Sequence, residues 1–265
     1  MIGRSFRYLA RTKGFTPLAV LFSVLALWAV VSSLRIFPPF ALPSPTAVFQ
    51  AFVLLFGNGY GGHVIEDDII ASLTRIILGF GGAICLGVPI GFLMAHSRLA
   101  FRIADPVLQL FRPVPPLAYI PLLIIWFGIG ELPKVLLILL GTIPVIIIGT
   151  ISGVRSMPPS RLAVARMLGA SEGQIFLHVV LPSALPEIFT AARVGIGISW
   201  TCLVAAELIA ADRGLGWLVQ YAGEALQVTV VIAGVILIGV LGYGMELAIR
   251  LVETRLVPWR GHDET

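Results

Sequence analysis

Residues 158–186, PPSRLAVARMLGASEGQIFLHVVLPSALP, form a polar stretch with its own start and stop signals inside an otherwise apolar chain. Ser160 is placed to cap a first short helix after the proline pair that opens the stretch. Gly169 is placed to end that helix in a left-handed turn. These signals predict a short helix that stops at a glycine.

A second short helix is predicted directly after Gly169. Ser171 and Gln174 have the spacing of a capping box, and Pro182 is expected to halt the helix. The residues expected on its apolar face are Ile175, Phe176, Val179 and Val180. Two capped helices joined at a glycine form a rigid knob that suits docking into a groove on another protein. An ordered loop without a partner is the alternative.

The composition of the whole chain points to a membrane. Of its 265 residues, 58% are hydrophobic and 12% are charged, whereas soluble domains have roughly 45–50% and about 25%. The mean hydropathy is +0.99 and the pI is near 9.4. The basic residues lie at the ends of apolar segments rather than in one patch, which favours a topology signal over nucleic-acid binding.

Apolar stretches of about 20 residues predict an all-α membrane protein with six spans in a single domain over residues 1–265. The expected spans are 16–34, 69–95, 107–127, 134–152, 188–210 and 229–250. The first stretch lacks a cleavage site followed by polar sequence, so a retained span is favoured over a signal peptide. The segment 46–56, with Ser44 and Pro45 as cap and first turn, is too short to cross and is expected at the outer interface.

Arginine and lysine are distributed unevenly between the two sides of these spans. The residues that the positive-inside rule assigns to the cytoplasm are Arg4, Arg7, Arg11, Lys13, Arg98, Arg102, Arg155, Arg161, Arg166, Arg255 and Arg260. The other side holds Arg35, Lys134 and Arg213 among a larger number of acids. Both termini and the stretch 158–186 are therefore expected in the cytoplasm.

Two polar features fall within apolar spans. Three prolines within residues 113–116 either break a helix inside the membrane or form an interfacial loop before a shorter span that starts near Leu117. Arg112, directly before them, either meets an anion in a pathway or reaches the headgroups. Glu207 is the clearest ionisable residue in an apolar run, and it serves as a partner for Arg75 or Arg193, as a gate, or as a contact for a substrate ammonium.

Aromatic and small residues give further expectations. Tyr119, Trp126 and Trp200 are candidates to line a cavity together with Arg112 and Glu207, although packing and interfacial belts use most such aromatics. The GxxxG spacings at residues 87–91 and 149–153 favour close helix packing.

Catalytic and cofactor motifs are absent from the sequence. It has no GxxxxGK[ST] motif for nucleotide phosphates, no GxSxG nucleophile motif and no cluster spaced for a metal. Cys85 and Cys202 are expected to be reduced packing residues. No cofactor is expected in this chain, and ATP-driven transport would need a separate ATPase.

The segments ARMLGAS and VVLPSALP resemble the coupling loop of permeases of bacterial ABC importers, the EAA loop. Ala165 matches the second alanine of that pattern, Gly169 its glycine, and Leu181–Pro182 its close, whereas Ala163 and Val164 replace the usual first two residues. The missing acid removes any salt bridge from that position. The resemblance implies that the residues contacting the ATPase subunit are Ala165, Arg166, Leu168, Gly169, Ala170 and Ser171.

Further blocks extend the resemblance over residues 40–261. They are LPSPTAV (42–48), ASLTRIILGF (71–80), DPVLQLFRPVPPLAYIPLLIIWFGIGE (105–131), LVAAELIAADRGLGWLVQYAGE (203–224) and LVPWRG (256–261). They resemble importers of taurine, alkanesulfonates, nitrate, bicarbonate or cyanate, with AAELIAADRGLG and PWRG most similar to taurine permeases.

The resemblance implies a type I ABC importer permease in the bacterial inner membrane. Its implied partners are a second copy of the permease, two ATP-binding subunits that hold ATP and magnesium, and a periplasmic or lipid-anchored substrate-binding protein. The chain itself would not be catalytic. An ion-coupled secondary transporter and an intramembrane hydrolase are the alternatives, and the lack of paired ionisable residues or of a histidine in the spans argues against them.

Overall fold

The computed structural model describes residues 15–38 and 40–259, and all the regular secondary structure within these ranges is helical. These residues divide into two compact units, one formed by the described residues up to 65 with 218–236 and the other by residues 66–217 with the described residues from 237 onward. The helical secondary structure of the described residues confirms the predicted all-α fold.

The first unit contains α2 (Phe15–Ser33) and α3 (Pro45–Asn58). Ser44 caps α3 by accepting a hydrogen bond from the Ala47 amide at 3.2 Å, and Pro45 occupies the first turn, as predicted. The Trp28 indole donates to the Pro43 carbonyl at 3.0 Å and so joins α2 to the start of α3.

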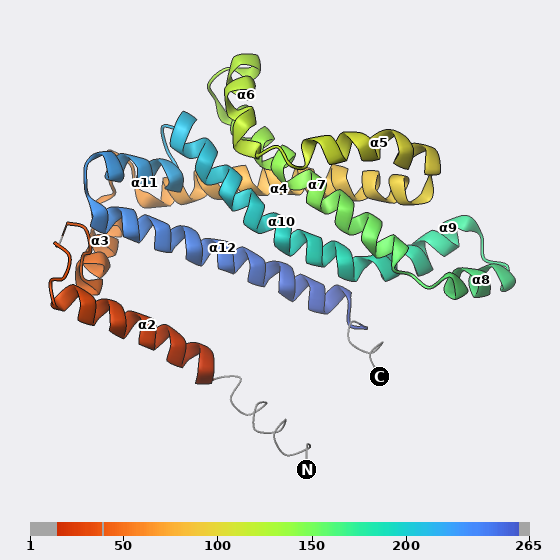
Figure 1. Cartoon of the computed structure of the whole chain (residues 1–265), viewed down its shortest axis with the longest axis horizontal. Helices are drawn as coiled ribbons and strands as arrows, with labels where there is room; N and C mark the ends of the chain where they lie inside the picture. The colour runs from red at the N-terminus through yellow and green to blue at the C-terminus, as the bar shows by residue number, and fades with distance from the viewer. Residues whose placement is uncertain (1–14, 39, 260–265) are drawn as a thin grey trace, which may run out of the picture. The chain divides into compact units, whose positions relative to one another are not determined.

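The remaining helices make up the second unit and the rest of the first. They are α4 (Ile65–His96), α5 (Arg98–Phe111), η1 (Pro116–Tyr119), α6 (Ile120–Phe127), α7 (Glu131–Arg155), α8 (Pro159–Met167), α9 (Glu172–Ile175), η2 (Phe176–Val180), α10 (Leu181–Ala210), α11 (Leu215–Glu224) and α12 (Val228–Leu256). The α-helices are labelled in Figure 1. η1 is a 3-10 helix and η2 is a π-helix.

Four helical stretches among the described residues are long and apolar enough to cross a membrane, or five if a bent pair counts as one span. They are α4, α7, the continuous stretch Glu172–Ala210, and α12. The predicted third span is wrong as one helix, because the chain bends by 91° between α5 and the segment Pro116–Phe127. Prolines without backbone N–H groups cause this break, as their spacing predicted.

Pro182 does not halt the second short helix. The helix continues from Glu172 through the π-helical turn η2 into α10. The π turn before Pro182 is wider than an α-helical turn. It accommodates the proline ring and the absence of the proline N–H, so the helix does not end there. Among the apolar residues of this segment, Ile175, Phe176 and Val180 line one cavity and Val179 lines another.

Helix α7 packs against α4 and α10 through small residues. A Cβ at Gly91 would lie 2.6 Å from the Thr150 Cβ, and one at Gly153 would lie 2.8 Å from the Ala184 carbonyl oxygen. The predicted packing role of both GxxxG segments is therefore confirmed.

Candidate functional site

The predicted knob is present as α8 and α9, joined at a turn (Figure 1). Helix α8 begins at Pro159, with Pro158 as its N-cap residue and no side-chain hydrogen bond at the cap. The prediction that Ser160 caps this helix is therefore wrong. Proline at the first helical position already has a helical φ angle, so the helix starts two residues earlier than a cap at Ser160 would place it.

The turn at Gly169 has the geometry that the sequence predicted. Gly169 has φ +77°, in the left-handed region. Its N–H donates to the Arg166 carbonyl at 3.0 Å, and the Ala170 N–H donates to the Ala165 carbonyl at 3.1 Å. These two bonds form a Schellman motif, which satisfies the last carbonyls of α8.

Helix α9 starts with the predicted capping box. The Gln174 N–H donates to the Ser171 hydroxyl at 3.4 Å, and the Ser171 N–H donates to the Gln174 side-chain oxygen at 2.8 Å. Arg166 and Glu172 approach at 3.4 Å across the turn, but both side chains are mostly exposed. Their ion pair adds little stability, and the order of the knob comes from its two capping motifs.

The tip of the knob presents apolar side chains to solvent. Met167 is 78% exposed and Leu168 is 81% exposed. No atom lies within 4 Å of a Cβ built on Gly169, so a side chain there would project outward. Exposed apolar side chains on an ordered turn are typical of a protein-docking surface.

A groove flanks each side of the knob. One has a volume of about 710 Å³, and the residues that line it include Val164, Ala165, Leu168, Pro182 and Trp259. The other has a volume of about 820 Å³, and its lining includes Phe92, Leu162, Arg166, Ile175 and Phe176. The knob therefore stands clear of the helices around it rather than being buried among them.

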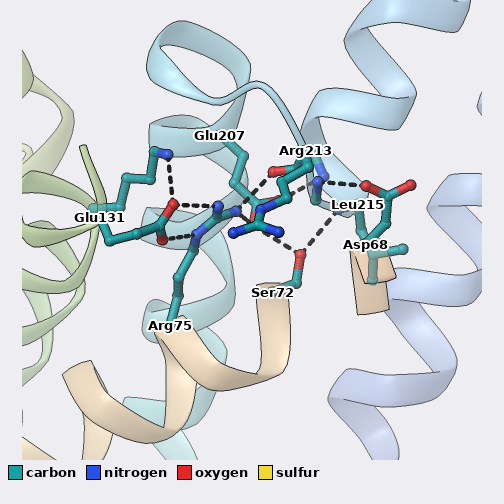
Figure 2. A network of polar contacts seen from close by, with 10 residues as sticks. Asp68, Ser72, Arg75, Glu131, Glu207, Arg213 and Leu215 are labelled. Atoms are coloured by element: carbon teal, nitrogen blue, oxygen red, sulfur yellow. Dashed lines mark hydrogen bonds and ion pairs between the residues drawn. The ribbon is translucent and has the colours of Figure 1, made fainter. Parts of the chain in front are cut away.

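A second polar site lies where α4 and α7 begin and α10 ends. We call it the Arg75 cluster; its members are Asp68, Ser72, Arg75, Glu131, Lys134, Glu207 and the backbone of residues 213–216 (Figure 2). Arg75 is 1% exposed and reaches between two carboxylates.

Arg75 binds Glu131 in a bidentate manner, with Nε–Oε2 and Nη2–Oε1 distances of 2.5 and 2.8 Å. Its Nη1 donates to Glu207 Oε1 at 2.6 Å and to the Arg213 carbonyl at 2.9 Å. Lys134 Nζ lies 3.1 Å from Glu131 Oε1. The Glu131 side chain is 54% exposed, so this carboxylate connects the buried charges to the surface.

The remaining oxygens of the cluster cap the start of α11. The amides of Gly214, Leu215 and Gly216 donate to Asp68 Oδ1, Ser72 Oγ and Glu207 Oε2 at 2.7, 2.9 and 2.7 Å. The cluster has three carboxylates and only two cations. These successive N–H groups and the helix dipole offset its excess negative charge.

The glycine at position 214 is required for this close approach. Its φ is +124°, and a Cβ there would lie 2.5 Å from Glu207 Oε1 and 2.7 Å from Arg75 Nη1. The DRGLG sequence therefore wraps its backbone around a buried carboxylate.

The structure resolves the partner of Glu207. This residue is 1% exposed and accepts hydrogen bonds from Ser72 at 2.7 Å, Arg75 and Gly216. Of the two arginines considered from the sequence, Arg75 is the partner, whereas Arg193 lies 3.6 Å from Glu253. Glu207 lies three residues before the end of α10 rather than deep within it. Contrary to the expectation of an isolated ionisable residue, it has charged and polar partners.

Sequence reasoning named Arg75 as one of two candidate partners of Glu207 but missed the rest of the cluster. Asp68, Ser72 and Arg75 recur at positions i, i+4 and i+7, which places them on one face of an apolar helix. That spacing is the signal that could have revealed them.

The other pathway candidates lie in different settings. Arg112 is the exposed C-cap residue of α5, and Tyr119 lies beyond the proline break with its ring 6.4 Å from that of Phe111. Trp126 is exposed near the end of α6, whereas Trp200 is buried on α10, two turns from Glu207. Their role in transport stays a prediction.

Comparison with known proteins gives consistent matches. Residues 87–258 match the family described as binding-protein-dependent transport system inner membrane component. The chain is 44% identical over 251 residues to the taurine transport system permease protein TauC of Escherichia coli (strain K12), covering 94% of this chain and 90% of that protein. It is 36% identical over 243 residues to the putative aliphatic sulfonates transport permease protein SsuC of Bacillus subtilis (strain 168), covering 91% and 86%.

The fold also matches a solved structure. A chain of the MetNI methionine ABC transporter in an inward-facing conformation aligns with a TM-score of 0.64 at 21% identity, covering 72% of this chain and 95% of that chain.

Proposed function

The chain belongs to the family of binding-protein-dependent transport system inner membrane components, and from that premise we propose that its importer carries organosulfonates, with taurine as the first candidate. The observation that supports this choice of substrate is the 44% identity to a taurine permease across 94% of the chain. The similarity to an aliphatic sulfonate permease supports the same chemical class.

In this proposal the permease works as a homodimer with two ATP-binding subunits and a periplasmic or lipid-anchored binding protein. Both termini and the knob lie in the cytoplasm. ATP and magnesium are held by the ATPase subunits, so the chain carries substrate without performing the hydrolysis. The exposed apolar tip, at Met167 and Leu168, supports a docking role for the knob.

The ATPase contact is formed by the knob residues Ala165, Arg166, Leu168, Gly169, Ala170 and Ser171. Two capping motifs fix their geometry, so a push on the turn moves α8 and α9 together instead of being lost in loop motion. Helix α9 continues without interruption into α10, which gives the knob a rigid connection to a membrane span.

The substrate is tested with the assembled importer in nanodiscs. We expect ATP hydrolysis that depends on the binding protein to rise with taurine and to a smaller extent with ethanesulfonate, and to stay at its basal rate with nitrate. Stimulation by nitrate, bicarbonate or cyanate alone would overturn the sulfonate proposal and favour the oxyanion alternative.

A further inference from the structure

Helix α5 has three faces, of which one is apolar and packed, one is polar, and one is apolar and exposed. At 100° per residue, Phe101, Ala104 and Leu108 share one face. These residues pack against the apolar cluster of Met94, Ile147 and Ile151 from α4 and α7. This face fixes α5 to two membrane-spanning helices.

The packing extends along α5. The Arg155 guanidinium, at the end of α7, lies 4.3 Å from the centroid of the Phe101 ring. Leu108, seven residues after Phe101, packs against the same apolar cluster. Helix α5 is therefore held against the cluster over two turns of its length and not only at its start.

The second face of α5 is polar along its whole length. Its residues recur at spacings of four, three, four and three, and they are Arg98, Arg102, Asp105, Gln109 and Arg112. Gln109 Nε2 donates to Asp105 Oδ2 at 2.6 Å, while Arg102 and Arg112 are exposed. Charged groups at membrane depth are stable only beside water or polar partners, so this face excludes lipid.

The third face is apolar and open. Its residues are between 54% and 70% exposed, and they are Leu99, Ile103, Val107 and Leu110. A helix with one face suited to water and another suited to an apolar environment belongs at the boundary between the two.

We propose that the polar face of α5 lines the cytoplasmic half of the aqueous translocation pathway, with Asp105 meeting the ammonium group of a zwitterionic sulfonate. The arginines on either side of Asp105 attract the sulfonate group, so the face offers both charges that a zwitterion needs. This inference rests on the proposed import of sulfonates. It adds a row of pathway residues from the start of the broken span to the proline break.

The first test uses single cysteines in the assembled importer after Cys85 and Cys202 are replaced by alanine. Cysteines at Arg102, Asp105 and Gln109 are compared with matched positions on the apolar face, namely Ile103, Val107 and Leu110. The probe is a membrane-impermeant sulfonatoethyl methanethiosulfonate added to inside-out vesicles. We expect labelling at least tenfold faster on the polar face, and slowed at least fivefold at positions 105 and 109 when a non-hydrolysable ATP analogue closes the ATPase dimer.

Equal labelling on the two faces would overturn the proposal. So would fast labelling of the polar face that does not change with nucleotide, because that result describes an amphipathic helix at the membrane surface. Since the labelling needs no transport substrate, its pattern stands even if the importer does not accept sulfonates. Membrane abundance and ATPase recovery of each variant exclude misfolding.

The second test compares two sulfonates that differ in the ammonium group. Asp105→Asn is expected to lower taurine uptake at least fivefold relative to ethanesulfonate uptake. Asp67→Asn, an exposed acid in the first turn of α4, is the matched control and should leave the ratio unchanged. An unchanged ratio in Asp105→Asn would overturn the role of Asp105.

Discussion

At the scale of single residues, Gly169 combines a conformational and a spatial requirement. Its φ of +77° costs a residue with a Cβ about 1 kcal/mol, and its Cβ direction is open. We predict that Gly169→Glu leaves the permease in the membrane, weakens recovery of the ATPase and abolishes taurine uptake. The measurement is co-purification of the ATPase alongside uptake.

Two further variants separate strain from steric obstruction at this turn. Gly169→Asn keeps a residue that tolerates left-handed backbone, so most of its effect reports the added side chain. Ala163→Glu, on exposed helix α8, restores the acid common in the family and should be tolerated. Normal ATPase recovery and uptake with Gly169→Glu would show that this turn is not the coupling element.

Glu207 has its acceptor oxygens filled by protein donors, which points to a structural role. In Glu207→Gln an amide NH₂ faces either the Gly216 N–H or the Arg75 guanidinium, and Arg75 loses one of its two carboxylates. Removing one partner of a buried ion pair typically costs about 3 kcal/mol or more. We predict a lower midpoint of thermal unfolding for the purified permease, with an unchanged preference among sulfonates.

The control for Glu207 is an acid in an exposed pair. Glu172→Gln breaks the 3.4 Å contact with Arg166, where both side chains are mostly exposed, and should change stability by less than about 1 kcal/mol. Equal midpoints for the two variants would contradict the structural role. A selective loss of taurine uptake with an unchanged midpoint would instead favour contact with the substrate ammonium.

At the scale of elements, the two short helices differ in how they start, and this difference is testable. Ser171 makes both bonds of a capping box, whereas Ser160 makes no cap bond. We predict that Ser171→Ala destabilises the start of α9 by about 1 kcal/mol and speeds amide hydrogen exchange over residues 172–176. Ser160→Ala is the matched control and should change neither exchange nor ATPase recovery.

The elements also show what the sequence could predict. The left-handed turn at Gly169 and the capping box at Ser171 depend on neighbours within a few residues, so their spacing was sufficient. The outcome at Pro182 was not predictable in the same way. Whether a proline ends a helix depends on how the preceding turn adapts, and here a π turn over Phe176–Val180 carries the helix past it.

For a related reason, neighbouring residues in the sequence were not enough to predict the bend in the third span or the partners in the Arg75 cluster. The prolines marked where the chain breaks, but their spacing did not give the 91° bend between α5 and the segment Pro116–Phe127. In the cluster, Glu207 was visible as an acid in an apolar run, while its partners Ser72 and Arg75 are 135 and 132 residues away. Spacing within one helix shows a polar face but not which residues it meets.

At the scale of the whole molecule, one helical stretch joins the two sites. Residues 172–210 run without interruption from the capping box of the knob to the Arg75 cluster, in which Glu207 lies near the end of α10. At about 1.5 Å per residue this stretch is roughly 55–60 Å long. A displacement of the knob can therefore reach the far end of a span through one element, as rigid-body coupling requires.

The orientation of this stretch gives the last prediction. The positive-inside rule places the knob in the cytoplasm and the end of α3 outside. Single cysteines at Ser171 and Asn58, in a background without native cysteines, should react with an impermeant maleimide from opposite sides, position 171 in inside-out vesicles and position 58 in intact spheroplasts. The corresponding prediction for His262 falls outside the described residues. Because the Arg75 cluster lies at the other end of the stretch from Ser171, labelling of position 171 from outside would place that cluster in the cytoplasm. It would also remove the knob from reach of an ATPase, and with it the proposed mechanism of coupling.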